Sequence, residues 1–309
     1  MKNYKNILIL KHGSLGDFIG LTGRFASIRH TWPKAHITLV TTKPYLELTK
    51  RMGYFDDYII DNRTKNPIDY IKMMCLLGSG KYDLIIDLQR QRRTIKRYYR
   101  LGRLWSKNGF RWAFVMPDGL TFQYTPPKHR LCWGKCQESF LKCPQEKNNV
   151  DFCKANPKVL AQLPKKFVLL IPGCSANSPH KRWPATSYAE LAKRLGKKGI
   201  TTVVLGTKIE AEIAKTICSY TSTAIDFCGK SSFFDIPGIV KKSMASIGND
   251  TGPQHMAEVT GVPCVSLFPT AHGKAAIQSP TVRNFISDNI ADIPVEDVEK
   301  ALQSLWHKA

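Results

Sequence analysis

The sequence predicts an α/β protein built from two Rossmann-like domains, each with a parallel sheet. Short apolar runs alternate with helical patterns through both halves, and 309 residues suit two domains of ordinary size. Hydrophobic residues make up 43% of the chain, which is enough apolar material for two cores. Because such sheets bind ligands at the carboxyl ends of their strands, we expect functional residues in the following loops, facing an interdomain cleft.

The predicted strands and helices alternate in a regular order. In the first half, we predict strands at 6–10, 36–41, 58–60 and 82–88, and helices at 17–30, 44–52 and 67–77. In the second half, we predict strands at 167–171, 201–205, 224–227, 245–248 and 262–268, and helices at 187–198, 210–219, 234–242, 253–260 and 295–307. This order indicates parallel sheets joined by right-handed crossovers.

A segment at about 117–166 separates the two halves. Its pattern is broken and rich in Pro, Lys and Cys, and we interpret its end, 155–166, as the linker. We therefore predict one domain over residues 1–155 and a second over 156–309. The last helix is a candidate to pack back on the first domain.

The positive charge of the chain is concentrated in its first half. Lys and Arg total 46 against 24 acidic residues, a net charge of +22. Residues 1–150 hold 27 basic and 11 acidic residues, a net +16, whereas residues 151–309 hold 19 and 13, a net +6. We therefore expect the first half to meet something negative: nucleic acid, a membrane surface or an acidic substrate.

The apolar runs and the cysteines indicate a cytoplasmic protein. No apolar run reaches the roughly 18 residues that span a bilayer, and the run at 7–10 is too short for a signal sequence. The nine cysteines lack regular spacing, which argues against a disulfide framework. Four lie close together without a C-x-x-C pair, so we expect unpaired thiols there and no metal: Cys132, Cys136, Cys143 and Cys153.

The loop after the first predicted strand reads KHGSLGD (11–17). Gly13 and Gly16 allow a tight turn and the close approach of a ligand to the backbone. Asp17 has two readings. It is either a helix cap or first-turn acid, or a carboxylate that takes a proton from a bound ligand.

Two further loops suit a phosphorylated ligand. In the long, polar loop 172–184, Lys181 could neutralise a diphosphate, and Ser175 and Asn177 could donate hydrogen bonds to it. The alternative is a solvated loop anchored by a packed tryptophan. The loop 248–255 reads GNDTGPQH and leads into a helix, which is typical of phosphate binding and makes candidates of Asp250, Thr251, Gly252 and His255.

A fourth candidate is the basic stretch 90–111, which holds nine Lys and Arg residues and no acid. Tyr and Trp residues interleave with them, and Arg93, Arg97 and Arg100 share one face at helical spacing. Nucleic-acid binding is one explanation. Contact with a membrane surface or a phosphosugar is another, and a solvated basic face is the third.

Several stretches, taken in order, carry a resemblance to a known family. They are ILILKHGSLGDFIGLTGRFASIRHTWPKAHITLVT (7–41), YDLIIDLQ (82–89), KRWP (181–184), and 229–270 with its D-T-G-P-x-H motif. Together they resemble glycosyltransferase family 9, the ADP-heptose:lipopolysaccharide heptosyltransferases. The similarity covers most of the chain and weakens between about 112 and 165. The segment AHGKAAIQSP (271–280) departs from the family pattern.

The resemblance implies a GT-B fold and an inverting transfer of heptose from ADP-heptose to the lipopolysaccharide inner core, with neither a metal nor a cofactor. By resemblance, Asp17 matches the general base and Lys181 the lysine that contacts the donor phosphates. Asp250, Thr251, Gly252 and His255 match the donor-binding turn. The first domain would then bind the acceptor and the second the donor.

The acceptor implied by the resemblance is an anionic glycolipid at the cytoplasmic face of the inner membrane. We therefore expect a peripheral membrane association and no nucleic-acid partner. The basic residues expected to approach the acceptor or the membrane are Arg92, Arg93, Arg97 and Arg100.

Three alternatives remain open from the sequence. One keeps the fold and uses another nucleotide sugar, as a transferase or an epimerase. Another is a non-catalytic nucleotide- or RNA-binding module that uses the stretch 90–111. The third, a nicotinamide dehydrogenase, is disfavoured because the first turn is G-x-x-G rather than G-x-G-x-x-G.

Overall fold

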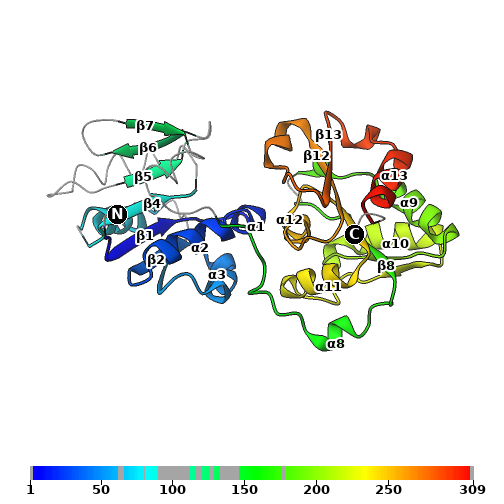
Figure 1. Cartoon of the computed structure of the whole chain (residues 1–309), viewed down its shortest axis with the longest axis horizontal. Helices are drawn as coiled ribbons and strands as arrows, with labels where there is room; N and C mark the ends of the chain where they lie inside the picture. Colours follow the sequence, from blue (N-terminus) through cyan, green and yellow to red (C-terminus); the bar gives the residue numbers. More distant parts are fainter. Residues whose placement is uncertain are drawn as a thin grey trace. The chain divides into compact units, whose positions relative to one another are not determined.

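The structure, a computed structural model, divides into two compact α/β units, Met1–Asn148 and Asn149–Ala309 (Figure 1). We had expected the division after residue 155. The residues it describes are 3–61, 66–79, 81–89, 112–115, 120–124, 129–132, 146–175 and 178–306.

The first unit has a sheet in the order β3-β2-β1-β4-β5-β6-β7. Its strands are β1 (Asn6–Leu10), β2 (His36–Thr41), β3 (Asp57–Ile60), β4 (Leu84–Asp87), β5 (Trp112–Val115), β6 (Leu120–Tyr124) and β7 (His129–Cys132). The predicted parallel pairing is confirmed from β3 through β4, and β5, which was not predicted, also pairs parallel with β4. The sheet then continues with β6 and β7, which pair antiparallel. The broken sequence pattern of this segment did not predict these strands.

The helices of the first unit are α1 (Leu15–Ile19), α2 (Thr22–Thr31), α3 (Leu46–Met52) and α4 (Pro67–Gly78), with the 3-10 turn η1 (Lys43–Tyr45) before α3. We predicted one helix over 17–30, but the structure has two. The first ends at Gly20, whose N–H donates to the carbonyl of Gly16, and the Thr22 hydroxyl donates to Ile19 at 2.9 Å. As a result, Asp17 lies on a short helix of its own.

Among the described residues, two sets of core side chains position the first loop of this unit. Leu8 and Leu10 of β1 pack with Met73 and Leu77 of α4. Aromatic rings form the other set: Phe18 of α1 lies 6.2 Å from Phe25 of α2 and 5.2 Å from Tyr45, measured between ring centroids. This packing anchors α1 beside the carboxyl end of β1.

The second unit has an entirely parallel sheet in the order β10-β9-β8-β11-β12-β13. Its strands are β8 (Phe167–Ile171), β9 (Thr201–Val204), β10 (Ala224–Asp226), β11 (Ala245–Asn249), β12 (Cys264–Pro269) and β13 (Val282–Ser287). Strands buried on both faces form continuous apolar runs, and β8 is buried at every residue. The edge strand β13, which is only partly buried, was not predicted.

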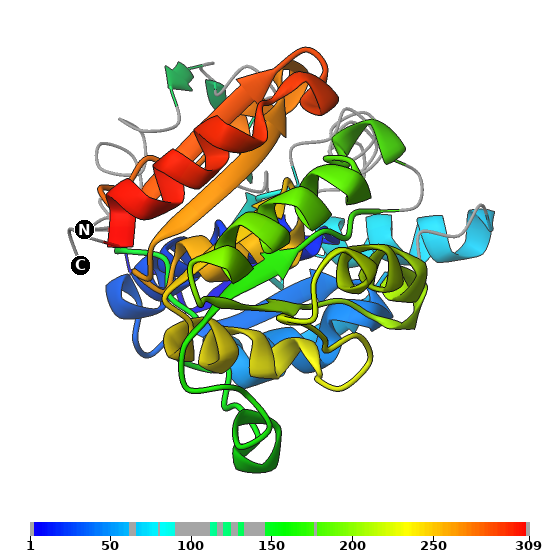
Figure 2. The ribbon, with the colours of Figure 1, turned by 90° about the vertical axis from the view of Figure 1, so that its right-hand side faces the viewer.

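Helices cover both faces of this second sheet. α9 (Ala185–Lys197) packs with α10 (Ala211–Tyr220) and α13 (Val295–Trp306), while α11 (Ile236–Lys242) packs with α12 (Gly252–Glu258) on the other face (Figures 1 and 2). The remaining elements are α8 (Pro157–Leu160) and the 3-10 turns η4 (Pro179–Lys181), η5 (Lys208–Glu210), η6 (Phe233–Asp235), η7 (Thr270–Ala275) and η8 (Ile290–Asp292).

The last helix, α13, packs within its own unit. Val298, Leu302 and Leu305 are buried in a core that they share with α9 and the sheet. Packing of this helix against the first domain as well stays a prediction. Throughout the described part of the chain, no helix combines the length and apolar character needed to cross a membrane.

Candidate active site

In the first unit, the loop after β1 forms one wall of a pocket of about 350 Å³. The pocket is lined by the β1–α1 turn and by residues from the ends of β2 and β4: His12, Gly13, Ser14, Asp17, Thr42, Tyr45 and Gln89. The lining is polar and lies at the carboxyl ends of parallel strands. This is the position at which the sequence predicted chemistry.

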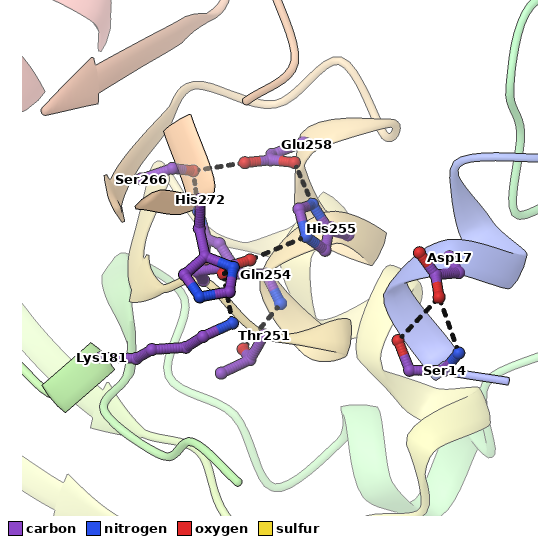
Figure 3. A network of polar contacts seen from close by, with 10 residues as sticks. Ser14, Asp17, Lys181, Thr251, Gln254, His255, Glu258, Ser266 and His272 are labelled. Atoms are coloured by element: carbon purple, nitrogen blue, oxygen red, sulfur yellow. Dashed lines mark hydrogen bonds and ion pairs between the residues drawn. The ribbon is translucent and has the colours of Figure 1, made fainter. Parts of the chain in front are cut away.

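Asp17 occupies the first turn of α1 and has the capping role that the sequence allowed. Its Oδ2 accepts hydrogen bonds from the backbone N–H of Ser14 at 2.8 Å and from the Ser14 hydroxyl at 3.3 Å, which completes a capping box (Figure 3). The Nζ of Lys11 pairs with the same oxygen at 3.3 Å. The carboxylate is 57% exposed, and Oδ1 makes no hydrogen bond or ion pair within the described residues. One oxygen holds the helix start, and the other can face a ligand.

The turn at Gly13 depends on the absence of a side chain. A β-carbon there would lie 2.7 Å from Cε2 of Tyr45, which is too close for any residue with a side chain unless the ring moves. Burial, together with the negative charge of Asp17, raises the pKa of Tyr45. Its phenol therefore stays protonated at neutral pH and can donate a hydrogen bond into the pocket.

Buried polar contacts fix the loop after β1 to the ends of the neighbouring strands. The backbone N–H of His12 donates to Oε1 of Gln89 at 2.7 Å, and the Thr42 hydroxyl donates to the carbonyl of His12 at 2.8 Å. The His12 Nε2 lies 2.8 Å from Oδ2 of Asp61. These bonds tie the ends of β1, β2 and β4 together and fix the shape of the loop.

In the second unit, Lys181, Asp250 and His255 form a compact charged cluster. The Nζ of Lys181 lies 2.5 Å from Oδ2 of Asp250, and Nε2 of His255 lies 3.2 Å from Oδ1 of the same carboxylate. Burial alone would raise the pKa of Asp250. Hydrogen bonds from His255 and Lys181 outweigh it and hold the pKa of Asp250 below its usual value. The structure therefore brings together three residues that the sequence selected from two separate loops.

A chain of polar contacts holds the other ring nitrogen of His255, Nδ1, on the side away from Asp250 (Figure 3). Its Nδ1 lies 2.8 Å from Oε2 of Glu258, whose Oε1 accepts from the Ser266 hydroxyl at 2.6 Å. The amide of Gln254 in turn donates to Ser266 at 2.8 Å. Burial would lower the pKa of His255, but hydrogen bonds to Asp250 and Glu258 and the charges of both carboxylates raise it to about 9. His255 is therefore a cation at neutral pH.

Asn249, at the end of β11, joins the two loops of the cluster. Its Oδ1 accepts from the Trp183 backbone N–H and from the Tyr188 hydroxyl, each at 3.1 Å, while its Nδ2 donates to the carbonyl of Pro172 at 2.8 Å. Trp183 is also buried and donates its indole N–H to Ile293. The loop is therefore anchored at the tryptophan, and Lys181 next to it is held toward Asp250.

The other predicted residues of the second unit take different places. Thr251 is the N-cap of α12, where its hydroxyl accepts from the backbone N–H of Gln254 at 3.4 Å, and Gly252 is the first residue of that helix. Ser175 is exposed, and its hydroxyl makes no contact with the cluster within the described residues. In the first unit, Gly16 lies within α1. Predicted residues that lie outside the described residues are Asn177, Arg92, Arg93, Arg97 and Arg100.

The sequence analysis missed two histidines beside the cluster. Nδ1 of His272, in η7, lies 3.7 Å from Oδ2 of Asp250. Its ring stacks on that of His180, with a centroid separation of 6.1 Å and an interplanar angle of 28°. His272 falls in the segment that departs from the family pattern, so no motif pointed to it. Only the fold of β12 and η7 brings it to the cluster.

Neither site contains an obvious set of metal ligands. Across the described residues, no three His, Cys, Asp or Glu side chains are grouped as a metal ion would require. Of the close cysteines, Cys153 is buried, while Cys136 and Cys143 lie outside the described residues.

The two units, each with its polar site at the carboxyl ends of parallel strands, have the GT-B fold of solved glycosyltransferases. The family model for glycosyltransferase family 9 (heptosyltransferase) matches residues 110–303, more than half of the chain, and the chain belongs to this family.

Similar proteins agree with this assignment. The lipopolysaccharide core heptosyltransferase OpsX of Haemophilus influenzae is 24% identical over 292 residues, which cover 85% of this chain and 79% of that protein. A family 9 glycosyltransferase from Veillonella parvula has a TM-score of 0.71 at 18% identity, covering 100% of this chain and 99% of that one. The E. coli heptosyltransferase WaaC, solved with ADP-2-deoxy-2-fluoro heptose, has a TM-score of 0.67 at 14% identity, covering 97% and 99%. The two structures show the same fold.

Proposed function

We propose that this glycosyltransferase moves a heptose from ADP-heptose to the inner core of lipopolysaccharide, with inversion at the anomeric carbon and without a metal. The family and the names of its relatives support the sugar and the acceptor. The observation that supports the chemistry is that one unit carries an exposed carboxylate, Asp17, and the other carries two cations, Lys181 and His255, around one carboxylate.

On the donor side, Lys181 and His255 would meet the diphosphate of the nucleotide sugar. Both are positively charged at neutral pH, and both now contact one carboxylate, Asp250. An incoming diphosphate would compete with this carboxylate for the ammonium group of Lys181. Positive charge placed where negative charge develops is the main way in which a site without a metal can stabilise a leaving diphosphate.

On the acceptor side, Asp17 would act as the general base. Its Oδ2 is held by Ser14 and Lys11, so the carboxylate has a defined orientation and its Oδ1 is available to a hydroxyl group. The proton of the acceptor hydroxyl passes to Asp17 as the new bond to the anomeric carbon forms. The bond to the diphosphate oxygen breaks, and both electrons leave with the nucleotide. Attack opposite the leaving group inverts the anomeric centre.

The first domain would bind the acceptor, and its positive charge fits an anionic glycolipid at the cytoplasmic surface of the inner membrane. Basic residues close to an anionic surface contribute about 1 kcal/mol each. We include in this surface the residues selected from the sequence: Arg92, Arg93, Arg97 and Arg100.

The first experiment is a binding panel that identifies the donor class. Ligand binding raises the unfolding temperature, so we expect ADP and ADP-heptose to stabilise the protein more than UDP or GDP at equal concentration. Stabilisation by UDP instead would favour the alternative transferase or epimerase. Salt-sensitive binding of RNA without stabilisation by any nucleotide would favour the nucleic-acid-binding module.

The second experiment tests the base directly. Asp17→Ala should reduce heptose transfer from ADP-heptose by about 10²–10⁴-fold. The lost cap should cost about 1 kcal/mol of stability, so the variant should remain folded. Asp57→Ala, which removes an exposed carboxylate at the start of β3, is the matched control and should transfer at the normal rate. Full activity of Asp17→Ala would show that another group is the base.

A further inference from the structure

His255 lies between two carboxylates that differ in their surroundings. Its Nε2 lies 3.2 Å from Oδ1 of Asp250, and its Nδ1 lies 2.8 Å from Oε2 of Glu258. The Asp250 carboxylate also contacts Lys181 and His272, and the His272 side chain is 41% exposed. The Glu258 side chain, in contrast, has no exposed surface. A ligand that arrives from solvent therefore meets the Asp250 side of the cluster and not Glu258.

A chain of hydrogen bonds fixes the buried carboxylate of Glu258. The Nε2 of Gln254 donates to the backbone carbonyl of Val265 at 3.2 Å and to Oγ of Ser266 at 2.8 Å. Because Ser266 accepts from this amide, its own hydroxyl donates to Oε1 of Glu258, at 2.6 Å. The other oxygen, Oε2, accepts from Nδ1 of His255. Glu258 is thus held at both of its oxygens.

The backbone makes room for this chain at Gly248, in β11. A β-carbon there would lie 2.5 Å from Oε1 of Gln254 and 2.9 Å from the β-carbon of Ile171, which is too close for any residue with a side chain. Gln254 and Ser266 are fully buried. Burying a carboxylate with its polar partners costs hydration, and apolar side chains of similar size often serve stability as well or better. The chain therefore indicates a role beyond packing α12 against the sheet.

The contact with Glu258 sets the state of the His255 ring. A ring nitrogen that faces a carboxylate carries a proton, because both partners would otherwise be acceptors. Charged groups reach the ring from α12, through Glu258, and from the loop after β11, through Asp250, which also binds Lys181 and His272. Both nitrogens face carboxylates, in agreement with the pKa of His255, which is raised to about 9. A diphosphate that replaced Asp250 would leave the Nδ1 bond in place.

We propose that Glu258 is a positioning residue for donor binding: it holds the His255 ring through Nδ1 and directs the protonated Nε2 at the diphosphate, while Asp250 is the carboxylate that the diphosphate displaces. Naming a diphosphate as the ligand rests on the proposed function, but the effect of Glu258 on His255 does not. Of the two carboxylates, only Asp250 lies on the side from which a ligand arrives.

The effect of Glu258 on His255 can be measured without any ligand. In the full chain labelled with ¹⁵N at histidine, NMR titration should show His255 with a midpoint near pH 9. Glu258→Gln keeps the size of the side chain and removes its charge, so it should lower this midpoint by about one to two units. The matched control is Glu299→Gln on α13, because Glu299 is also a buried glutamate and pairs with Lys198 and Arg194. A midpoint that does not move in Glu258→Gln, or that moves as much in the control, would overturn the proposal.

A second measurement separates positioning from a merely structural role. Calorimetry with ADP should show that Glu258→Gln weakens binding by about tenfold at pH 8.5, where the His255 of the variant has lost its proton, and by less than about twofold at pH 6, where it is still charged. Each loss is taken relative to the unmodified protein at the same pH, so the titration of ADP itself cancels. Glu299→Gln should bind normally at both pH values. Equal losses at both pH values would show that Glu258 only supports the fold of the site and would overturn positioning.

Inorganic pyrophosphate serves as a second probe in the same experiment, because it carries the diphosphate without the nucleoside. If the unmodified protein bound UDP or pyrophosphate but not ADP, the proposed donor would be wrong, and the comparison of the two pH values with that ligand would still decide the role of Glu258. If it bound none of the three, the proposed function would fail, and the histidine titration would decide whether Glu258 controls His255.

Discussion

The buried carboxyl of Asp87 should make the first unit less stable as the pH rises. Burial raises the pKa of Asp87 in the folded protein to about 7, whereas the ordinary value for an aspartate, 3.8, applies to the unfolded chain. A group whose pKa is raised by folding contributes its full stability below the unfolded pKa and loses it as the pH passes through the folded pKa. The loss attributable to Asp87 should therefore develop between about pH 4 and pH 7.

The size of the effect follows from the same shift. At about 1.4 kcal/mol per pH unit, a difference of about three units corresponds to about 4 kcal/mol at pH 8, but only about 1.5 kcal/mol at pH 5. Asp87→Asn removes this pH-dependent loss. The new amide N–H groups have no acceptor at the buried Oδ2 position, which costs about 1–3 kcal/mol at every pH. The stability of the variant relative to the unmodified protein should therefore improve by about 2–3 kcal/mol from pH 5 to pH 8.

The assay must report on one unit at a time, because two units need not unfold together. We would measure urea unfolding by pulsed hydrogen exchange and mass spectrometry, following peptides that contain β1 and β4. Asp83→Asn, which weakens two backbone hydrogen bonds, is the control. It should lower the free energy of unfolding, and its stability relative to the unmodified protein should not rise from pH 5 to pH 8 as that of Asp87→Asn does. A free-energy difference between Asp87→Asn and the unmodified protein that is the same at both pH values would refute the reasoning.

Three further predictions concern the donor site and the basic stretch. Because the pKa of His255 is raised to about 9, the stabilisation that protonated His255 gives the second unit should be complete below about pH 6.5 and should be lost as the pH rises through 9. Urea unfolding at a series of pH values should show this decline in the free energy of unfolding, and an unchanged value from pH 7 to pH 9.5 would contradict it. If the imidazole of His272 contacts the terminal phosphate of ADP, His272→Gln should weaken ADP binding by about threefold to tenfold and leave AMP binding nearly unchanged. Calorimetry measures both affinities, and equal losses for the two nucleotides would exclude that contact. The last prediction concerns four basic residues: Arg92, Arg93, Arg97 and Arg100. Changing all four to Gln should weaken binding to vesicles that contain anionic lipid and should raise the KM for the acceptor. If neither value changes, these residues do not contact the acceptor or the membrane.

Much of the fold could be read from local patterns. Strands such as β1 and β8 are continuous apolar runs, and each is followed by a glycine-containing loop, so their places were predicted to within a residue or two. Strands β5–β7, which lie in the segment with the broken pattern, and the edge strand β13 were missed. The edge strand β13 is only partly buried, and its sequence, VRNFIS, lacks the continuous apolar run of a central strand.

The candidate site was predicted where motifs and strand ends coincide. Asp17, Lys181, Asp250 and His255 were selected from the sequence, and the last three do form one cluster. The roles within the cluster could not be predicted. Whether a carboxylate in such a loop pairs with a lysine, a histidine or a ligand depends on distances that only the fold sets.

The sequence by itself determined the α/β class, the order of most strands and helices, and the loops that carry the charged residues, because these depend on neighbours along the chain. The tertiary structure alone decided that His12 contacts Asp61 and that His272 reaches Asp250. These contacts join residues distant in sequence, through the register of parallel strands and the return of a later loop. The raised pKa of Asp87 arises from burial, which no local pattern specifies.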